Sequence, residues 1–364
     1  MGRKESNGAI ARLSSKITLK NRNNSSETPF EKATVVRFSD NRLLPLLYGE
    51  HDCHLARLEE SFRIRISSRG NKVSLSGAET AVGLGIKSLN TLYRRLEKGL
   101  LVNSAEVDAI IRLVSDKRSP GRSKSDLNEE TSIQTPRGIL TARSAGQIDY
   151  IKALAQEQMV FGIGPAGTGK TYLAVAAAAS MLVSGEVDRI ILSRPAVEAG
   201  ERLGFLPGDL REKIDPYLAP LYDALHDMLP SDQVLNRFNS GEIEVAPLAF
   251  MRGRTLSHAF IILDEAQNAT KTQMKMFLTR IGEGSRMAIT GDPSQVDLPA
   301  GTPSGLTHAV KTLNDIKGVR VIQFGSADVV RHQLVAKIVR AYDRDDKKRR
   351  GTFKTSGKSD NDIG

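Results

Sequence analysis

The stretch MVFGIGPAGTGKTYLAVAAAAS (159–180) decides the fold, because it joins three kinds of sequence in one order. An apolar run typical of a buried strand is followed by the pattern G-x-x-x-x-G-K-T, and then by an alanine-rich run typical of a helix. This is the context that a phosphate-binding loop requires. The glycines let backbone amides turn toward phosphate groups, and the helix adds its positive end. The residues expected to bind nucleotide are Gly164, Pro165, Ala166, Gly167, Thr168, Gly169, Lys170 and Thr171. Lys170 supplies a positive charge for the phosphates, and the Thr171 hydroxyl is expected to bind Mg²⁺.

The sequence around this loop predicts an α/β domain. Five further short apolar runs, RIILS, IEVAP, AFIIL, RMAIT and VRVIQF, alternate with helical stretches between residues 141 and 342. Continuous apolar runs of this kind are typical of strands that are buried on both faces. We therefore expect a parallel sheet flanked by helices.

An acidic pair follows one of these apolar runs, in AFIILDEAQNAT (259–270). We expect Asp264 to contact Mg²⁺, directly or through water, and Glu265 to polarise an attacking water. A surface turn or a helix cap is the alternative interpretation of the same pair. The sequence contains no Asn-Lys-x-Asp element that would recognise guanine, so ATP is favoured over GTP.

Two glutamines complete the expected nucleotide site. In RMAITGDPSQVDLP (286–299), the strand is expected to lie beside the Asp264 strand, which would bring Asp292 and Gln295 near the γ-phosphate. An amide at Gln295 could sense whether the terminal phosphate is present. Gln147, in AGQIDYIKAL (145–154), is expected to read the adenine edge. The order of these motifs resembles the first motor domain of superfamily 1 helicases.

Composition divides the rest of the chain. We expect a disordered basic tail over 1–30, a small α+β domain over 31–115, a linker over 116–140, the nucleotide-binding domain over 141–342, and a second disordered tail over 343–364. Most of the net charge of +10 lies in the two tails and around the linker. Such segments either raise the encounter rate with RNA or DNA or only keep the protein soluble.

The single cysteine, together with the lack of a secretory signal or a membrane-length apolar run, predicts a cytoplasmic protein without membrane contact.

Several longer strings resemble the PhoH family of ATPases: SRPAVEAGERLGFLPGD (193–209), FMRGR (250–254), IILDEAQN (261–268), TGDPSQVDLP (290–299) and DVVRHQLVAKIV (328–339). The resemblance covers nearly all of 141–342. It implies a single RecA-like P-loop domain and a cytoplasmic, Mg²⁺-dependent ATPase with a role in RNA metabolism. It further implies a homo-oligomeric ring, with a hexamer as one candidate, and an endoribonuclease partner in ribosomal-RNA maturation.

The resemblance to helicases also suggests roles for four arginines. The 364-residue chain has room for one motor domain, so we expect an arginine of a neighbouring subunit to complete the ATP site, and Arg331 is the candidate finger. An ordinary solvated arginine is the alternative. Arg194 is expected to contact RNA, unless it forms an internal ion pair with Glu198 or Glu201. Arg252 and Arg254 could line the same groove or an interface.

The segment 31–115 resembles a KH domain, which clamps a nucleic-acid backbone with a Gly-x-x-Gly loop. The corresponding tetrad here is Gly49-Glu50-His51-Asp52, which carries two acids and lacks the second glycine. We therefore favour packing, oligomerisation or partner docking over RNA binding for this domain.

Two functions remain open for the whole chain: an ATPase coupled to RNA or to an RNA-processing complex, and a nucleotide-gated assembly module with slow, RNA-independent hydrolysis. Which RNA or partner is involved, and whether strands are unwound, is not specified by the sequence.

Overall fold

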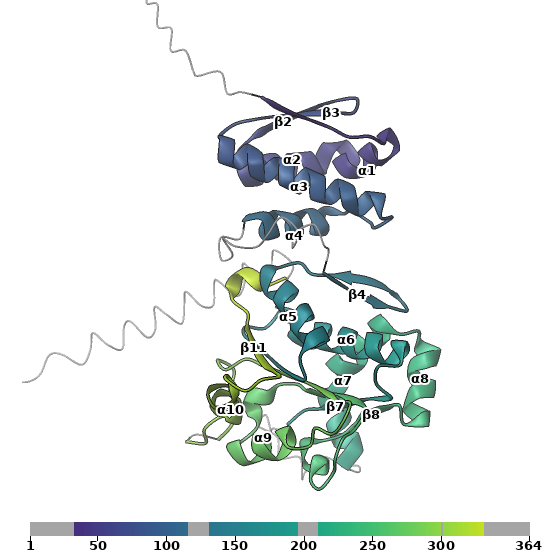
Figure 1. Cartoon of the computed structure of the whole chain (residues 1–364), viewed down its shortest axis with the longest axis vertical. Helices are drawn as coiled ribbons and strands as arrows, with labels where there is room; N and C mark the ends of the chain where they lie inside the picture. Colours follow the sequence, from purple (N-terminus) through teal and green to yellow (C-terminus); the bar gives the residue numbers. More distant parts are fainter. Residues whose placement is uncertain (1–32, 116–130, 196–209, 300, 331–364) are drawn as a thin grey trace, which may run out of the picture.

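The computed structural model describes residues 33–115, 131–195, 210–299 and 301–330. These residues form two parts, each around its own hydrophobic core (Figure 1). Helix α4 (Ser104–Ser115) lies between the N-terminal sheet and the larger part. The candidate arginine finger Arg331 falls outside the described residues.

The N-terminal part is a three-stranded antiparallel sheet covered by helices on one face. Its strands are ordered β1-β3-β2, and Val73 and Leu75 of β3 point into the core. The order of the main elements is β1-α1-α2-β2-β3-α3-α4, which agrees with the small α+β domain expected from the sequence. The elements are β1 (Thr34–Arg37), α1 (Leu44–Tyr48), α2 (Cys53–Phe62), β2 (Arg65–Arg69), β3 (Lys72–Ser76) and α3 (Glu79–Glu97).

The larger part contains a six-stranded sheet of order β11-β6-β10-β9-β7-β8, in which every pairing is parallel. All six strands coincide with the apolar runs identified in the sequence, so the predicted α/β class is confirmed. The central strands β6 and β9 are buried along their whole length. The strands are β6 (Met159–Ile163), β7 (Arg189–Ser193), β8 (Ile243–Val245), β9 (Ala259–Leu263), β10 (Arg286–Gly291) and β11 (Val319–Gln323).

Helices cover both faces of this sheet. On one face, α5 (Ala145–Gln156), α6 (Lys170–Ser184), α7 (Leu210–Met228) and α8 (Ser231–Ser240) contribute to one core cluster. On the other, α9 (Lys271–Leu278) and α10 (Gly305–Leu313) contribute to a second cluster. Five alanines between residues 174 and 179 of α6 let this helix lie close to the sheet, because small side chains permit close backbone approach.

A β-hairpin precedes the sheet. Strands β4 (Ser132–Thr135) and β5 (Gly138–Thr141) pair antiparallel, and all of their residues but Thr141 lie in the range 116–140 that was expected to be a linker from its serine, proline and charge content. The hairpin exists because Ile133 is buried in the core cluster that α6 shares. Tertiary packing therefore gives structure to a segment of polar composition. None of the described helices is long and apolar enough to cross a membrane.

Candidate functional site

The glycine-rich loop joins the end of β6 to the start of α6 at the carboxyl edge of the sheet. Gly164, Gly167 and Gly169 have φ angles of 148°, 82° and 82°, which side chains rarely adopt. A Cβ atom on Gly164 would lie 2.5 Å from the carbonyl oxygen of Phe324, which directly follows the neighbouring strand β11. Both observations explain why glycine is required where the loop turns. The resulting curvature leaves the loop backbone open toward the start of α6.

Lys170 directs its ammonium group back into this loop. Its Nζ donates hydrogen bonds to the carbonyl oxygens of Gly164 (2.8 Å) and Pro165 (2.9 Å), and the residue is only 8% exposed. Carbonyl oxygens hold the ammonium at the centre of the loop, where phosphate oxygens could replace them at little cost in electrostatic energy.

Asp264 follows β9 directly and is almost completely buried, at 4% exposure. Its Oδ1 accepts hydrogen bonds from the hydroxyl groups of Thr171 (2.6 Å) and Thr290 (2.6 Å). The expected magnesium ligands Thr171 and Asp264 are therefore in contact across 93 residues of sequence. Among the described residues no cluster of three or more His, Cys, Asp or Glu side chains could hold a metal by itself. One carboxylate and one hydroxyl fit Mg²⁺ that arrives with phosphate oxygens as its other ligands.

Glu265 has a left-handed backbone with a φ of 51°, so its side chain leaves the line of the strand. The carboxylate is held from two sides. Its Oε1 lies 3.6 Å from Nη2 of Arg194, and its Oε2 accepts a hydrogen bond of 2.5 Å from the Gln267 amide. The expected general base is thus paired with the arginine that the sequence analysis assigned to RNA. The alternative partners considered for Arg194, Glu198 and Glu201, lie outside the described residues.

The turn after β10 is organised by Asp292. Its Oδ1 accepts hydrogen bonds from the backbone nitrogen (2.9 Å) and hydroxyl (2.7 Å) of Ser294, and its Oδ2 accepts one from the Gln295 amide (2.6 Å). The backbone nitrogen of Asp292 donates to Oε1 of Gln267 (3.0 Å). Strand β10 pairs with β9, as expected, and also with β6. The turn therefore emerges between the phosphate loop and Asp264.

These side chains surround one open cavity of about 450 Å³ at the carboxyl edge of the sheet. Ligands of open α/β sheets bind at this edge. The cavity is lined by residues predicted for the nucleotide site, namely Ala166, Gly167, Gly169, Lys170, Thr171, Asp264, Glu265 and Gln295, and by Arg194.

Comparison with known proteins agrees with this geometry. The family model described as PhoH-like protein matches residues 139–343. The chain is 48% identical to the PhoH-like protein of Bacillus subtilis (strain 168) over 299 residues, which is 82% of this chain and 93% of that protein. It is equally similar to the PhoH-like protein of Mycobacterium tuberculosis (strain ATCC 25618 / H37Rv), at 48% over 301 residues, covering 82% and 84% of the two chains.

The chain belongs to the PhoH-like family. The Protein PhoH of Escherichia coli (strain K12) is 46% identical over 205 residues, which is 56% of this chain and 58% of that protein. Among solved structures, the Sulfolobus solfataricus SWI2/SNF2 ATPase core in complex with dsDNA matches 39% of this chain and 29% of its own, at 16% identity and a TM-score of 0.26. That likeness is too weak to support any argument.

Gln147 lies beside the phosphate loop of this PhoH-like domain, at the start of α5. Its Nε2 donates a hydrogen bond to the carbonyl oxygen of Thr168 (2.9 Å), and its Oε1 accepts one from the backbone nitrogen of Arg143 (2.7 Å). The side chain is 5% exposed and lines a second cavity next to the loop. One hydrogen of the amide and one lone pair of its oxygen remain available for a base.

Two of the arginines assigned to RNA do not line the phosphate cavity. Arg254 makes a bidentate ion pair with Glu244 on β8, with Nη–Oε distances of 2.6 and 2.7 Å. The hydrogen bonds to that carboxylate raise the pKa of Arg254. Arg254 is therefore engaged at the edge of the sheet, whereas Arg252 is exposed. The candidate finger Arg331 remains a prediction, because it lies outside the described residues.

The loop equivalent to the KH tetrad connects α1 to α2. His51 and Asp52 both have left-handed backbones, with φ angles of 52° and 57°. The Glu50, His51 and Asp52 side chains are exposed, so the two acids face solvent where a KH domain presents a clamp for phosphate. The geometry supports a turn between helices with an acidic tip.

Sequence reasoning missed Asp223 and Asp227 of α7, which line the phosphate cavity, and two buried polar residues that hold the site together. Thr290, inside β10, holds Asp264, and Gln267 joins Glu265 to the turn after β10. Both residues belong to strings that were quoted for the family resemblance. The available signal was their polarity: Thr290 is fully buried and Gln267 is 1% exposed, and buried polar groups need partners.

Proposed function

We propose that this chain is an Mg²⁺-dependent ATP hydrolase that couples hydrolysis to the binding or remodelling of RNA, or to an RNA-processing complex in ribosomal-RNA maturation. One observation carries the proposal. The Thr171 hydroxyl meets the buried Asp264 carboxylate at 2.6 Å, beside a complete phosphate loop that contains Lys170. A structural helix cap at Asp264 would not need this pairing with the first turn of α6.

In this mechanism the loop binds the phosphates and Lys170 moves its ammonium from carbonyl oxygens to phosphate oxygens. Mg²⁺ would be held by Thr171 and Asp264, and when bound it would supply neutralisation of the phosphate charge. Thr290 keeps the Asp264 carboxylate oriented. Gln147 contributes an amide edge for adenine.

Glu265 acts as the base that positions the attacking water. Its ion pair with Arg194 and its hydrogen bond from Gln267 hold the carboxylate before the reaction. RNA that attracts the Arg194 guanidinium would release Glu265, which would make hydrolysis depend on RNA. Gln295, held by Asp292, would sense the γ-phosphate, and Arg331 of a neighbouring subunit would stabilise the transition state in a ring-shaped homo-oligomer.

A second function has one observation in its favour, the acidic tip of the loop between α1 and α2. A surface of this kind suits docking of a basic protein partner better than phosphate. In this alternative, ATP binding sets the assembly or docking state, and slow hydrolysis independent of RNA resets it.

Steady-state ATP hydrolysis distinguishes the two functions. The rate is measured with and without single-stranded RNA, at several protein concentrations, with Lys170→Ala as the control for contaminating hydrolases. An RNA-coupled oligomeric motor gives strong stimulation by RNA and a specific activity that rises with protein concentration. A slow rate indifferent to RNA would favour the assembly module, and hydrolysis equal in wild type and Lys170→Ala would refute both.

A further inference from the structure

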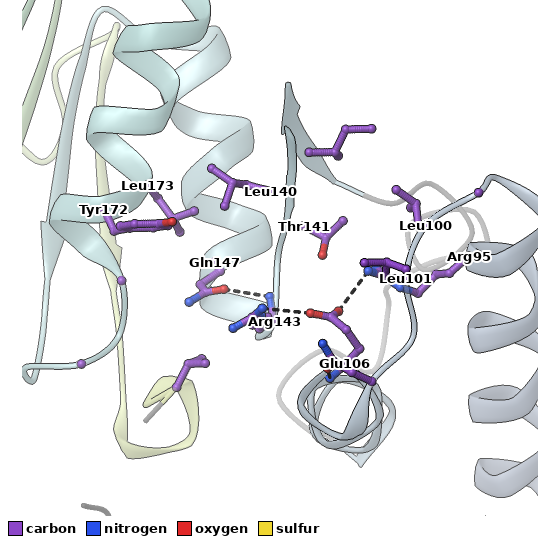
Figure 2. A pocket seen from close by; sticks show the side chains of 16 residues that line it. Arg95, Leu100, Leu101, Glu106, Leu140, Thr141, Arg143, Gln147, Tyr172 and Leu173 are labelled. Atoms are coloured by element: carbon purple, nitrogen blue, oxygen red, sulfur yellow. Dashed lines mark hydrogen bonds and ion pairs between the residues drawn. The ribbon is translucent and has the colours of Figure 1, made fainter. Parts of the chain in front are cut away.

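A cavity of about 650 Å³ lies between the N-terminal part and the PhoH-like domain. Figure 2 shows its two walls. Tyr172, Leu173 and Leu140 belong to the PhoH-like side, and Leu100 and Leu101 belong to the segment between α3 and α4. The cavity is large enough for a purine nucleoside, since ligand pockets begin at about 300 Å³.

This interdomain cavity adjoins the phosphate cavity. The two cavities share Gly167, Gly169 and Tyr172 as lining residues. A ligand whose phosphates lie against Lys170 can therefore extend past the glycines of the loop into the interdomain cavity. The two spaces together suit a molecule with an anionic end and a flat, mostly apolar end.

The interdomain cavity offers apolar surface to such a ligand. Leu101 is 84% exposed, Ile139 is 49% exposed and Tyr172 is 36% exposed. All three line this cavity. Large apolar side chains that stay in contact with water and gather around one cavity are typical of a ligand site. The tyrosine ring provides a flat contact area for a base, and the leucine and isoleucine side chains add apolar contacts.

A continuous set of polar contacts runs along one side of the cavity (Figure 2). It starts where Gln147 contacts the phosphate loop and passes through Arg143, whose Nη2 donates to Oε1 of Glu106 at 2.9 Å. Oε2 of Glu106 lies 3.0 Å from Nη2 of Arg95 on α3. Glu106 and Arg95 are 7% and 6% exposed, so this ion pair is shielded from water. The N-terminal part is thus fixed to the residue expected to read the base.

We propose that the N-terminal part caps the nucleoside of the bound nucleotide, with Leu101 against the base or ribose and the Arg143–Glu106 pair holding the cap in place. This inference rests on the proposed function, because it assigns the remaining part of the same ATP. It gives the N-terminal part a role in nucleotide binding that does not depend on RNA. ATP binding would cover the segment between α3 and α4 and add contacts to those that already join the N-terminal part to the PhoH-like domain.

The test compares Leu101→Asp with Leu46→Asp in the full-length chain. Leu46 is also an exposed leucine of the N-terminal part, at 56%, and it does not line the cavity. Binding of MgATP and of Mg-tripolyphosphate is measured by calorimetry. Tripolyphosphate occupies only the phosphate cavity. Leu101→Asp is expected to raise the Kd for MgATP by about tenfold, because a buried leucine contact is lost. It should leave the Kd for tripolyphosphate unchanged, and Leu46→Asp should change neither.

Hydrogen exchange provides a readout that does not depend on a substitution. MgATP is expected to protect the backbone amides of α4 and of the segment before it, whereas tripolyphosphate is not. Equal ATP affinity in the two leucine variants, or equal protection by both ligands, would overturn the cap. A wild-type chain that binds neither ligand would instead overturn the proposed function itself.

Discussion

Replacement of Thr290 by valine removes one hydroxyl from the site and keeps the shape of the side chain. The Thr290 hydroxyl is fully buried and donates a hydrogen bond of 2.6 Å to Oδ1 of Asp264. Thr290 is fully buried and valine fills the same space, so water cannot take the place of the lost donor. The carboxylate would keep only the Thr171 hydroxyl on that oxygen. The substitution therefore tests whether Thr290 holds the expected magnesium ligand.

The magnitude follows from the kind of bond. A hydrogen bond to a charged acceptor contributes about 1.5–3 kcal/mol, so Thr290→Val should lower the free energy of unfolding by about 2 kcal/mol. For a domain of this size the melting temperature should fall by roughly 4–8 °C. Thr135→Val is the matched control, because the Thr135 hydroxyl is buried and donates to a neutral acceptor, the carbonyl oxygen of Gly138, at 2.9 Å. That loss should cost about 1 kcal/mol.

The assay combines thermal unfolding with a magnesium titration of ATP hydrolysis. Loss of a partner that orients a metal ligand typically weakens metal binding by about 10–100-fold, so Thr290→Val should need roughly tenfold more Mg²⁺ for half-maximal rate. Thr135→Val should not change this requirement, and Thr290→Ser should restore both properties. The reasoning is refuted if Thr290→Val melts no lower than Thr135→Val and needs no more Mg²⁺ than the wild type.

Three further outcomes test the other assigned roles. Glu265→Gln should lower turnover by roughly a hundredfold or more while the Kd for ATP stays unchanged, and wild-type turnover would exclude Glu265 as the base. Arg194→Ala should abolish stimulation by RNA, weaken RNA binding and reduce the salt-dependence slope of RNA affinity by about one, because one phosphate contact is lost; an unchanged slope would show that Arg194 pairs with Glu265 and does not contact RNA. Arg331→Ala should bind ATP normally but turn it over roughly a thousandfold more slowly, and mixing it with Lys170→Ala should restore activity if the arginine acts in trans. No recovery in the mixed oligomers would place Arg331 elsewhere.

The inner strands of the larger sheet could be predicted from the sequence because they are buried on both faces, whereas the edge strands β8 and β11 are only partly buried. Strands β6 and β9 are fully buried, so their apolar runs carry no polar interruptions. The β4–β5 hairpin has no such pattern. Its residues alternate between exposed and buried in only four positions, and a proline and an arginine lie at its turn. Composition there indicates a linker, whereas the buried Ile133 and the partly buried Leu140 attach the hairpin to the core.

The residues of the site also differ in whether the sequence could predict them. The phosphate loop and Asp264 were found because their chemistry requires fixed residue types beside a strand end. The partners Thr290 and Gln267 act on residues that neighbouring strands supply, and their roles depend on sheet order. The contact between Arg194 and Glu265 joins residues 71 positions apart, so the sequence offered no reason to pair them. Pairing of this kind is a property of tertiary structure.

The order of the strands explains why β10 ends in a rigid turn that carries the acid Asp292 and the amide Gln295. Strand β10 lies between β6 and β9, so its end stands between the phosphate loop and Asp264. The backbone nitrogen of Gly164 donates to the carbonyl oxygen of Gly291 (3.1 Å), which ties the loop to this turn.

The next residue, Asp292, binds the Gln267 side chain, and Gln267 in turn binds Glu265. A shift of the phosphate loop must therefore move the turn or break a buried hydrogen bond, and the turn cannot move without changing the position of Gln267. Because the carboxylate of Asp292 fixes both Ser294 and Gln295, the turn responds as one body. The arrangement places the sensing amide of Gln295 and the proposed catalytic base Glu265 at the two ends of a single short connection, which is what an ATPase needs to link the state of its γ-phosphate to the position of its base.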